Sequence, residues 1–430
     1  ATRQAIERRM TVADFDAVLD MMAAGGNPTY TGKLVSPRTA LGVSACWACV
    51  NVLADDLASI PFTVYRWLEP EISREKARDH YLWRLLLEEA NQRMTAFEFQ
   101  QLMETWRQLW GNAYAEIEIN GRGQVVALWP WRPDRVKVWL EDPNELRSRV
   151  WYSYLPLGKN TNPITLPSDR ILHLRHISVD GLIGLSPIEV HREKFSIDMA
   201  MQEYSGRFYS NGGIVHGVLT HPGKLNEKTE QSLRESMKQY QGVSNAHRLM
   251  ILEQGMELKE VGLKQEDAQY IQTMNFSAND IARIYKVPPH RIGQLDRATF
   301  SNIEHSAIEY VQYTLRPNTE HWVQRLNCWL LSERDRQQYF VDPDYSYLIK
   351  GDSAARAKLY QVLGALGWMT PDEGRAMEGM NPLPDGLGRV PRVPLNTSSA
   401  DKTETEEPAV SGQVVPAAKP NGKANGGLYR

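Results

Sequence analysis

The stretch NDIARIYKVPPHRIGQLDRATFSNIEHSAIEYVQYTLRP, residues 279–317, decides the fold because it joins two long helices through a charged loop. Apolar residues at spacings of three and four predict a helix over 265–286. Pro288 and Pro289 end this helix, since proline has no backbone N–H and its ring clashes with the preceding turn. A further long helix is expected over 303–331, interrupted and kinked at Arg316 and Pro317.

The loop between these helices, 290–302, carries Arg291, Asp296 and Arg297 and few apolar side chains. One interpretation is a solvated connection between helices. The other is a loop that presents charged and polar groups to a ligand in a channel. The residue pattern alone favours the first interpretation.

A compact module interrupts the helical pattern upstream of this stretch. Ser186 and Pro187 offer an N-cap and a first helical residue for a helix that runs to about Ser210. The order helix, small α/β module, helix is therefore predicted for 187–287. The elements expected in the module are a strand near 215–219, a helix over 226–240, and strands over 248–253 and 256–261.

The N-terminal part up to about residue 186 mixes helices and strands and is expected to be α+β. An amphipathic stripe ending before Pro61 indicates a helix over 38–60, and Thr95 is a plausible N-cap for a helix over 95–110. The stripe consists of Cys46, Val50, Leu53, Leu57 and Ile60. Strands are expected at 62–67, 113–119, 124–129, 135–140, 150–155 and 170–175.

Beyond residue 331 one strand and two short helices are expected, over 337–342, 352–366 and 370–378. The segment 390–430 is rich in Pro, Ser, Thr and Gly without apolar periodicity, and it is predicted to be disordered. Residues 1–37 are polar and punctuated by Gly and Pro, which indicates a flexible, loosely tethered arm.

The composition is that of an ordinary soluble protein. The 430 residues include 42% hydrophobic and 23% charged residues, and the net charge is −3. No apolar run approaches the roughly 18 residues of a membrane span, so no membrane association is expected. The three cysteines supply no disulfide framework, and a reducing cytosol suits them. A nearly neutral chain is not expected to grip nucleic acid tightly, because phosphate contacts require cationic side chains.

Two short motifs look chemical but have simpler explanations. Cys46 and Cys49 have the C-x-x-C spacing of redox and zinc sites, yet both lie inside a predicted helix rather than at its N-terminus. We interpret them as small buried apolar residues. Asp55 and Asp56 are adjacent on the same helix and point about 100° apart, so they cannot readily share a metal or a substrate.

The glycine-rich segment 181–187 precedes a helix but lacks the Lys-Ser/Thr pair of a phosphate-binding loop. A tight turn that leads into a helix N-cap explains it. We identify no nucleophile–base pair, metal-ligand cluster or cofactor fingerprint in the sequence. The chain is therefore predicted to have no catalytic or metal site, to need no cofactor and not to be an enzyme.

Five long stretches occur in a highly specific order, at residues 36–65, 93–136, 181–190, 279–317 and 344–386. They begin SPRTALGV, RMTAFEFQ, GLIGLSPI, NDIARIYK and DYSYLIKG. Together they resemble the HK97-type phage portal family, and the resemblance is collinear over roughly residues 36–386.

The resemblance implies the phage portal fold, an α+β chain with wing, stem, clip and crown regions that assembles as a ring around a central channel. The implied regions are a flexible N-terminal arm (1–37), the wing (38–186), the first stem helix (187–212), an α/β clip (213–262), the second stem helix (263–287), a tunnel loop (288–302), the long helix and returning strand of the wing (303–349), the crown (350–389) and a disordered tail (390–430).

The resemblance also implies a function. Proteins of this family form the ring at the unique capsid vertex through which double-stranded DNA is packaged and ejected, without sequence specificity. The implied partners are identical subunits in a dodecameric ring, the terminase motor, a head–tail adaptor and the major capsid protein. The implied location is the virion, and the host cytoplasm during assembly.

Within this plan the tunnel loop and the second stem helix supply candidate channel residues that face DNA. They are Arg291, Gln294, Asp296, Arg297, Thr299, Arg283 and Lys286. The candidates for docking a partner lie on the exposed helix of the clip, and they are Arg234, Lys238 and Gln239. For each residue, an ordinary solvated polar side chain is the alternative interpretation.

Two other functions fit the sequence less well. Another ring-forming head–tail connector or adaptor protein of the virion would usually be much shorter and would lack the inserted module. A nucleic-acid-processing enzyme of the packaging machinery would need a phosphate-binding loop or a carboxylate metal cluster, and neither is found in the sequence.

Overall fold

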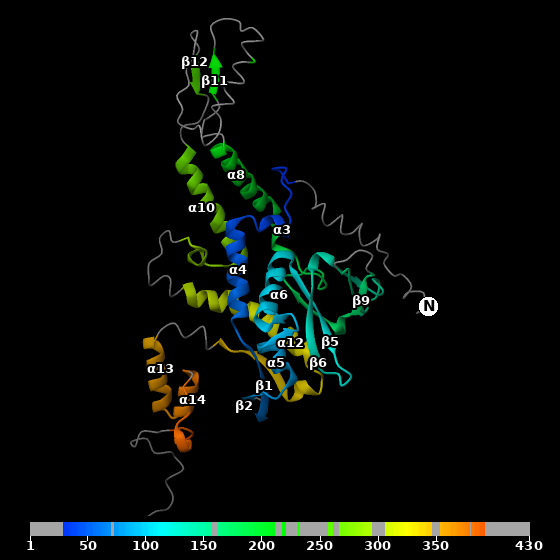
Figure 1. The fold of residues 1–430 in the computed structure, drawn as a ribbon, viewed down its shortest axis with the longest axis vertical. Coiled ribbons are helices and arrows are strands. Elements are labelled where there is room, and N and C mark those ends of the chain that lie inside the picture. Colours follow the sequence, from blue (N-terminus) through cyan, green and yellow to red (C-terminus); the bar gives the residue numbers. More distant parts are fainter. Residues whose placement is uncertain are drawn as a thin grey trace, which may run out of the picture. The chain divides into compact units, whose positions relative to one another are not determined.

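The computed structural model describes residues 29–69, 73–156, 162–210, 217–220, 231, 257–260, 266–294, 306–345, 353–378 and 380–391. The contacts divide the chain into two units, Ala1–Tyr345 and Ser346–Arg430. Helices and strands are mixed throughout the first unit (Figure 1). The expectation of an α+β fold is therefore confirmed.

Two helices, α4 (Ser44–Ala58) and α6 (Ala96–Trp110), lie side by side in the first unit (Figure 1). Every member of the apolar stripe predicted on α4 is at most 1% exposed. Removing this surface from water is the main favourable contribution to folding here. Thr95 caps α6 through a capping box with Glu98, as the sequence predicts.

The helix predicted over 38–60 is divided in two, which the sequence analysis did not anticipate. Ser36 caps a first turn, α3 (Pro37–Ala40), and α4 begins only at Ser44. Gly42 lies between the two helices, where a Cβ atom would stand 3.2 Å from the Thr39 carbonyl oxygen. Because glycine lacks a side chain and is a poor helix former, the chain turns at this position.

A three-stranded antiparallel sheet, in the order β10-β5-β6, packs against α6. β5 (Asn112–Ile119) and β6 (Val125–Trp131) form the predicted hairpin, and β10 (Ile171–Arg175) pairs with the other edge of β5. The turn from α6 into β5 requires Gly111, whose φ of 72° is left-handed. A Cβ atom on Gly111 would also approach the Leu185 carbonyl oxygen to 2.3 Å.

Smaller sheets complete the described part of the first unit. β1 (Phe62–Glu69) pairs with β2 (Ser73–Lys76) and with β13 (Tyr339–Pro343). β8 (Val150–Tyr154) pairs with β7 (Val136–Leu140) and β9 (Ile164–Pro167). The helix α5 (Tyr81–Leu87) is followed by a short pair, β3 (Glu89–Asn91) and β4 (Met94–Thr95). Single turns of 3₁₀ helix are η1 (Pro133–Arg135), η2 (Ser168–Arg170) and η6 (Asp335–Gln337).

The residue pattern does not predict α5, β2, β3, β4 or β9. The strand β2, with the sequence SREK, has no apolar alternation. It is stabilised by its pairing with β1 and by ion pairs of 2.6 Å from Arg74 to Asp342 and 3.3 Å from Lys76 to Asp344. Such a strand is stabilised by residues of other strands, and its own sequence does not identify them.

The helix predicted after Ser186 and Pro187 is present as α7 (Pro187–Val190) and α8 (Arg192–Ser210), with a break at His191. The strands β11 (Gly217–Thr220) and β12 (Glu257–Glu260) pair with each other, and α10 (Glu266–Tyr285) follows. These strands agree with the two outer strands predicted for the inserted module. The predicted strand over 248–253 and the predicted helix over 226–240, apart from helical Gln231, lie outside the described residues.

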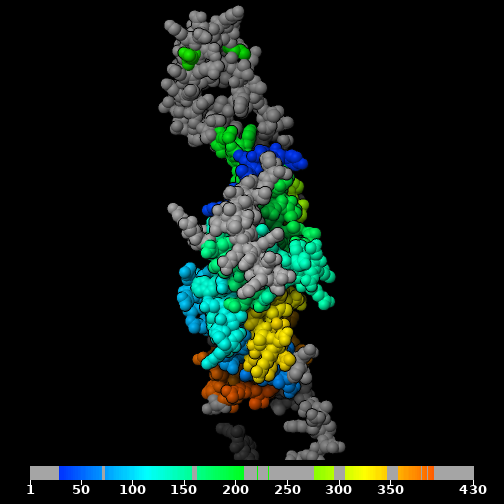
Figure 2. Space-filling model, turned by 90° about the vertical axis from the view of Figure 1, so that its right-hand side faces the viewer, coloured from blue at the N-terminus to red at the C-terminus, as the bar shows by residue number. Residues whose placement is uncertain are grey.

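The second long helix is present but irregular. Residues 306–310 are helical, a π-helical turn covers Val311–Leu315 (η5), and α12 spans Arg316–Leu330. The sequence predicts a kink at Pro317, and the irregularity lies in the turn just before it. A wider turn accommodates the proline, whose ring cannot enter a regular α-helical turn without a clash. Residues coloured yellow, a range that includes α12, and residues coloured cyan lie on the same face of this unit (Figure 2).

Residues 29–36 belong to the segment expected to be a loosely tethered arm, but they are attached to α8. The backbone N–H of Tyr30 donates a 3.1 Å hydrogen bond to Glu193, and the Thr31 hydroxyl donates one of 3.3 Å to the Ser196 carbonyl. Lys33 forms an ion pair with Glu203. Residues 1–28 lie outside the described part of the chain.

The second unit contains α13 (Ser353–Ala365) and α14 (Pro371–Met377), followed by the turn η8 (Pro384–Gly386). Both helices were predicted. Gly367 has a left-handed φ of 70° between them, and Thr370 caps α14 through a capping box with Glu373. The tail from residue 392 onward lies outside the described residues.

Candidate functional site

Three side chains meet where the predicted tunnel loop leaves α10. One guanidinium nitrogen of Arg291, on the 3₁₀ turn η4 (Pro289–Ile292), lies 2.8 Å and 2.6 Å from the two carboxylate oxygens of Asp56. The Tyr310 hydroxyl donates a 2.7 Å hydrogen bond to the same carboxylate. The guanidinium also lies 4.9 Å from the centre of the Tyr310 ring. We call Asp56, Arg291 and Tyr310 the loop-base clamp.

The three side chains of the loop-base clamp differ in their exposure to solvent. Tyr310 is 3% exposed, whereas the side chains of Asp56 and Arg291 are 19% and 33% exposed. Burial and the nearby Asp56 carboxylate raise the pKa of Tyr310, so its hydroxyl remains protonated and donates. The cluster therefore ties α4, η4 and the helix that follows the loop to one carboxylate.

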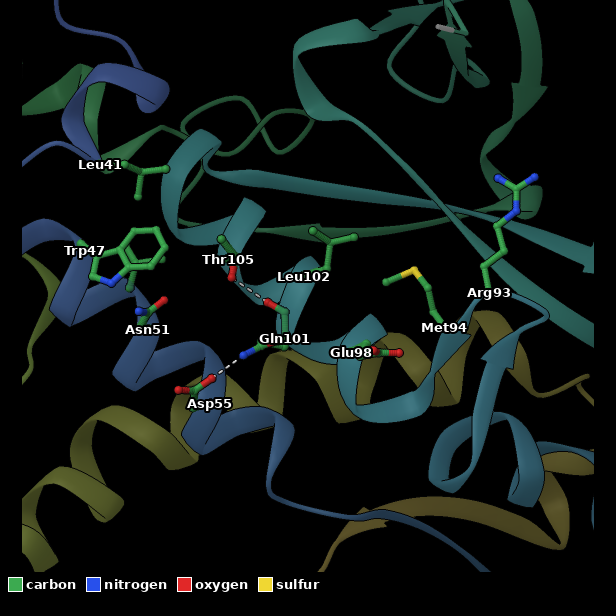
Figure 3. Close-up of a pocket in the computed structure, with 11 residues that line it drawn as sticks. Leu41, Trp47, Asn51, Asp55, Arg93, Met94, Glu98, Gln101, Leu102 and Thr105 are labelled. Atoms are coloured by element: carbon green, nitrogen blue, oxygen red, sulfur yellow. Dashed lines mark hydrogen bonds between the residues drawn. The ribbon is translucent and has the colours of Figure 1, made fainter.

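Asp55 and Asp56 diverge as the helical geometry predicts. Asp55 accepts a hydrogen bond from Gln101 of α6, and this contact is drawn in Figure 3. Asp56 faces Arg291 instead. The two carboxylates serve different neighbours, so they do not form a shared acidic site.

Four of the predicted channel residues are described, and the structure brings them to the end of α10 and the turn after it. Arg283 has a 75% exposed side chain, which lies 3.3 Å from Asp280. Lys286 is exposed and ends α10 with a left-handed φ of 55°. Its carbonyl oxygen accepts a 2.8 Å hydrogen bond from Thr314. Gln294 is half-buried, and its backbone N–H donates to the Pro289 carbonyl at 3.0 Å.

The remaining predicted site residues lie outside the described part of the chain. They are Asp296, Arg297 and Thr299 of the loop and Arg234, Lys238 and Gln239 of the inserted module.

A polar cluster links α8 to α10. The Lys194 ammonium lies 3.1 Å from Asp198 and 2.5 Å from the Ser277 hydroxyl, which also donates a hydrogen bond to Asp198. Asp198 is 5% exposed, and these contacts partner one oxygen of its nearly buried carboxylate, while Oδ2 has no hydrogen-bond partner among the described residues. They bring together two helices that lie on either side of the inserted module in sequence.

Sequence reasoning missed the most deeply buried charges of the described residues. Arg107 is 2% exposed and its guanidinium lies 2.6 Å and 2.9 Å from the carboxylate oxygens of Glu104, which is 0% exposed. Gln108 and the indole N–H of Trp322 donate further bonds of 2.7 Å and 2.9 Å to that carboxylate. Burial acts to raise the pKa of Glu104, but the Arg107 guanidinium and these donors hold it below its usual range.

The two helical cysteines are unreactive by position. Burial raises the pKa of Cys46 to about 11 and that of Cys49 to about 12, so both remain thiols at neutral pH. Cys46 contacts the Tyr285 hydroxyl at 3.7 Å. This agrees with their interpretation as small buried residues.

The glycine-rich segment 181–187 forms the predicted tight turn. The Asp180 carboxylate accepts the backbone N–H groups of Leu182 and Ile183 at 2.8 Å and 2.9 Å. The Ser186 hydroxyl caps α7 by accepting from the Glu189 N–H at 3.2 Å.

A groove of about 600 Å³ lies between α4 and α6 (Figure 3). Trp47, which is 53% exposed, and Leu102 lie on its wall, and Asp55, Arg93 and Glu98 are spread along its length. The charged groups do not converge on one point of the groove (Figure 3). The groove therefore lacks the arrangement that acid–base or nucleophilic catalysis requires.

The described residues contain neither a candidate metal-binding group nor a helix that could span a membrane. Among the described residues, no three His, Cys, Asp or Glu side chains are grouped so that they could hold a metal ion. Within the same residues, no helix combines the length and the apolarity needed to cross a membrane.

Comparison with known proteins shows which family the chain resembles. The sequence matches the phage portal protein family over residues 44–379. It is 29% identical over 374 residues to the portal protein of Enterobacteria phage HK97, covering 86% of each chain.

Solved structures are also similar to the fold. A crystal structure of an HK97 family phage portal protein from Corynebacterium diphtheriae matches with a TM-score of 0.52 at 16% identity, over 74% of this chain and 99% of that one. A chain in the neck of a native gene transfer agent particle, computed with C12 symmetry, matches with a TM-score of 0.52 at 21% identity, over 86% of this chain and 100% of that one.

The family match covers well over half of the chain, and the fold agrees with that of a solved portal protein. The matched region includes the elements around the inserted module and the three residues of the loop-base clamp. The chain therefore belongs to the phage portal protein family.

Proposed function

We propose that identical copies of this chain assemble into a ring that forms a channel for double-stranded DNA at the unique capsid vertex. The observation that carries the proposal is the family match over residues 44–379. The twelvefold symmetry of the gene transfer agent neck, which contains a chain of similar fold, supports a dodecameric ring.

The element order supports the regional plan of a portal subunit. α8 and α10 flank the paired strands β11 and β12, as expected for two stem helices, 187–212 and 263–287, on either side of a clip, 213–262. The polar cluster around Lys194 and Asp198 would hold the two stem helices together. We assign residues 38–186 and 303–349 to the wing and 350–389 to the crown.

In this plan the tunnel loop, 288–302, and the polar end of α10 face the DNA. Gln294, Asp296, Arg297 and Thr299 would line the constriction, with Arg283 and Lys286 beside them. Arg291 would also face the DNA, in addition to forming its ion pair with Asp56. A chain with a net charge of only −3 suits a conduit, because a strongly basic channel would hold the phosphate backbone and slow its passage.

The clip is the surface that we propose for docking other proteins. Arg234, Lys238 and Gln239 would contact the terminase during packaging and a head–tail adaptor afterwards, while the wing would meet the major capsid protein. The subunit would reside in the host cytoplasm during assembly and in the virion afterwards. Portal proteins are structural, and we propose that this chain catalyses no reaction and uses no cofactor.

Negative-stain microscopy of the purified full-length chain tests the proposal. We expect rings with a central hole, and no ATP hydrolysis unless terminase is added. A monomeric globule, or ATPase activity of the chain by itself, would contradict it.

A further inference from the structure

The described residues on the two sides of the segment 295–305 contact the same carboxylate. Arg291 lies three residues before Gln294, and Tyr310 lies in the helix that begins by residue 306. The two side chains meet at Asp56, which is 235 residues from Arg291 and 254 from Tyr310 in sequence. The described parts of the chain before and after this segment therefore meet at one residue of α4.

A second contact fixes the helix that precedes the loop. The Thr314 hydroxyl, in the π-helical turn, donates a 2.8 Å hydrogen bond to the carbonyl of Lys286. Lys286 has a φ of 55°, a left-handed conformation that is unfavourable for a residue with a side chain. Because this contact does not involve Asp56, we expect it to persist when the Asp56 carboxylate is changed.

We propose that Asp56 is the positioning residue of the tunnel loop, which it holds in place by fixing Arg291 at the start of the loop and Tyr310 in the helix that follows it. This inference rests on the proposed role of residues 288–302 as the channel loop. Asp56 need not touch DNA, because it acts through the two residues that it binds.

The contacts indicate why one carboxylate controls the loop. Charge-assisted hydrogen bonds are stronger than neutral ones, and the stacking of the guanidinium on the Tyr310 ring fixes its orientation as well as its distance. Without the carboxylate, the 33% exposed Arg291 side chain is free to turn into water. The Tyr310 hydroxyl, on a 3% exposed side chain, loses its acceptor in a place that water reaches poorly.

The adjacent aspartate supplies a matched control. Asp55→Asn changes the same residue type one position away on α4, and it alters a contact with Gln101 rather than with the loop. The test compares Asp56→Asn, Arg291→Gln and Asp55→Asn by hydrogen-exchange mass spectrometry of the full-length chain, following peptides that cover 287–294 and 306–315.

Asp56→Asn and Arg291→Gln are expected to raise the exchange rates of 287–294 about tenfold, as the loss of a hydrogen bond to a charged group would. Asp56→Asn should also raise exchange in 306–315, whereas Asp55→Asn should change neither peptide. Asp56→Glu, which keeps the charge, should restore part of the protection. In rings of unchanged size, Asp56→Asn should also alter the rate of DNA packaging.

Unchanged exchange in both peptides of Asp56→Asn, or an equal rise in Asp55→Asn, would overturn the inference. If Asp56→Asn does not fold, Arg291→Gln and Tyr310→Phe decide the matter, since neither alters α4. A wild-type chain that never forms rings would contradict the proposed function, but the exchange comparison would still judge the clamp. The two failures are thus distinguishable.

Discussion

The loop-base clamp and the buried pair of α6 are built from the same chemical groups in different surroundings. In each, a carboxylate binds a guanidinium and accepts a hydrogen bond from an aromatic side chain of the second long helical segment. In the clamp the aromatic residue is Tyr310, and in the buried pair it is Trp322. The charged side chains of the clamp are 19% and 33% exposed, and those of the Glu104–Arg107 pair are 0% and 2% exposed.

This difference teaches what each cluster contributes. The attraction between buried charges is offset by their loss of hydration, so the pair of α6 adds little net stability while intact but is severely destabilising when broken. The partly exposed clamp keeps water nearby, so its loss costs less and changes the position of a loop rather than the fold. Four substitutions, taken from the largest expected effect to the smallest, can break or sharpen this contrast.

Arg107→Met should produce the largest effect, a loss of about 3–5 kcal/mol in the free energy of unfolding, because it leaves the Glu104 carboxylate buried without its partner. Denaturant titration followed by tryptophan fluorescence measures the loss. Arg207→Met is the matched control, since Arg207 has a 76% exposed side chain paired with Glu203. Equal effects at the two arginines would show that burial is not the cause.

The second-largest expected effect is a dependence of stability on pH, which arises from His176 near the Glu104–Arg107 pair. Burial lowers the pKa of His176 to about 4, and repulsion from the Arg107 guanidinium adds to this. In the unfolded chain this imidazole titrates near its usual pKa of about 6.5, so below that pH the unfolded state binds more protons. Stability should therefore fall as the pH decreases from about 6.5 towards 4.

His176→Gln should make that fall shallower, by no more than about 3 kcal/mol at the acid end. The measurement is the denaturation midpoint between pH 7 and pH 4. Identical pH profiles for the variant and the wild type would rule out His176 as a contributor.

Trp322→Phe should cost about 1–3 kcal/mol, because the buried carboxylate loses one donor while Arg107 and Gln108 remain. The half-buried Trp129 also donates to a carboxylate, that of Glu118 at 2.7 Å, and so Trp129→Phe is its control. Thermal unfolding should separate them, with the control within about 0.5 kcal/mol of the wild type. A larger loss of stability in Trp129→Phe than in Trp322→Phe would contradict the difference between buried and partly exposed carboxylates.

Tyr310→Phe should have the smallest effect, about 1 kcal/mol, because Asp56 keeps its contact with Arg291. Tyr313→Phe, at a 65% exposed position in the π-helical turn that directly follows Tyr310, is the control. If Tyr310→Phe destabilised the chain as much as Arg107→Met, the clamp would have to be regarded as part of the structural core.

The sequence predicts features that depend on neighbouring residues. The stripe on α4 follows from helical periodicity, and the caps at Thr95 and Ser186 follow from local hydrogen bonding. The order of a helix, an inserted strand pair and a second helix is also readable from punctuation by Pro and Gly. These parts of the fold were predicted correctly.

Features that depend on distant residues were missed. Helical periodicity places Glu104 on the polar side of α6, and it is buried because Trp322, 218 residues later, covers it. The partner of Arg291 is 235 residues away, so the sequence identified Arg291 as a candidate residue without its link to Asp56. Burial of a charge is a property of the assembled fold, and no local pattern records it.

A ring-resolved cryo-electron microscopy reconstruction of the full-length chain tests the central claim most directly. The account predicts a closed ring in which the segment from Arg291 to residue 302 faces the central hole, with Arg291 still bound to Asp56 at the base. A ring in which that segment points away from the axis, or particles without a central hole, would contradict it.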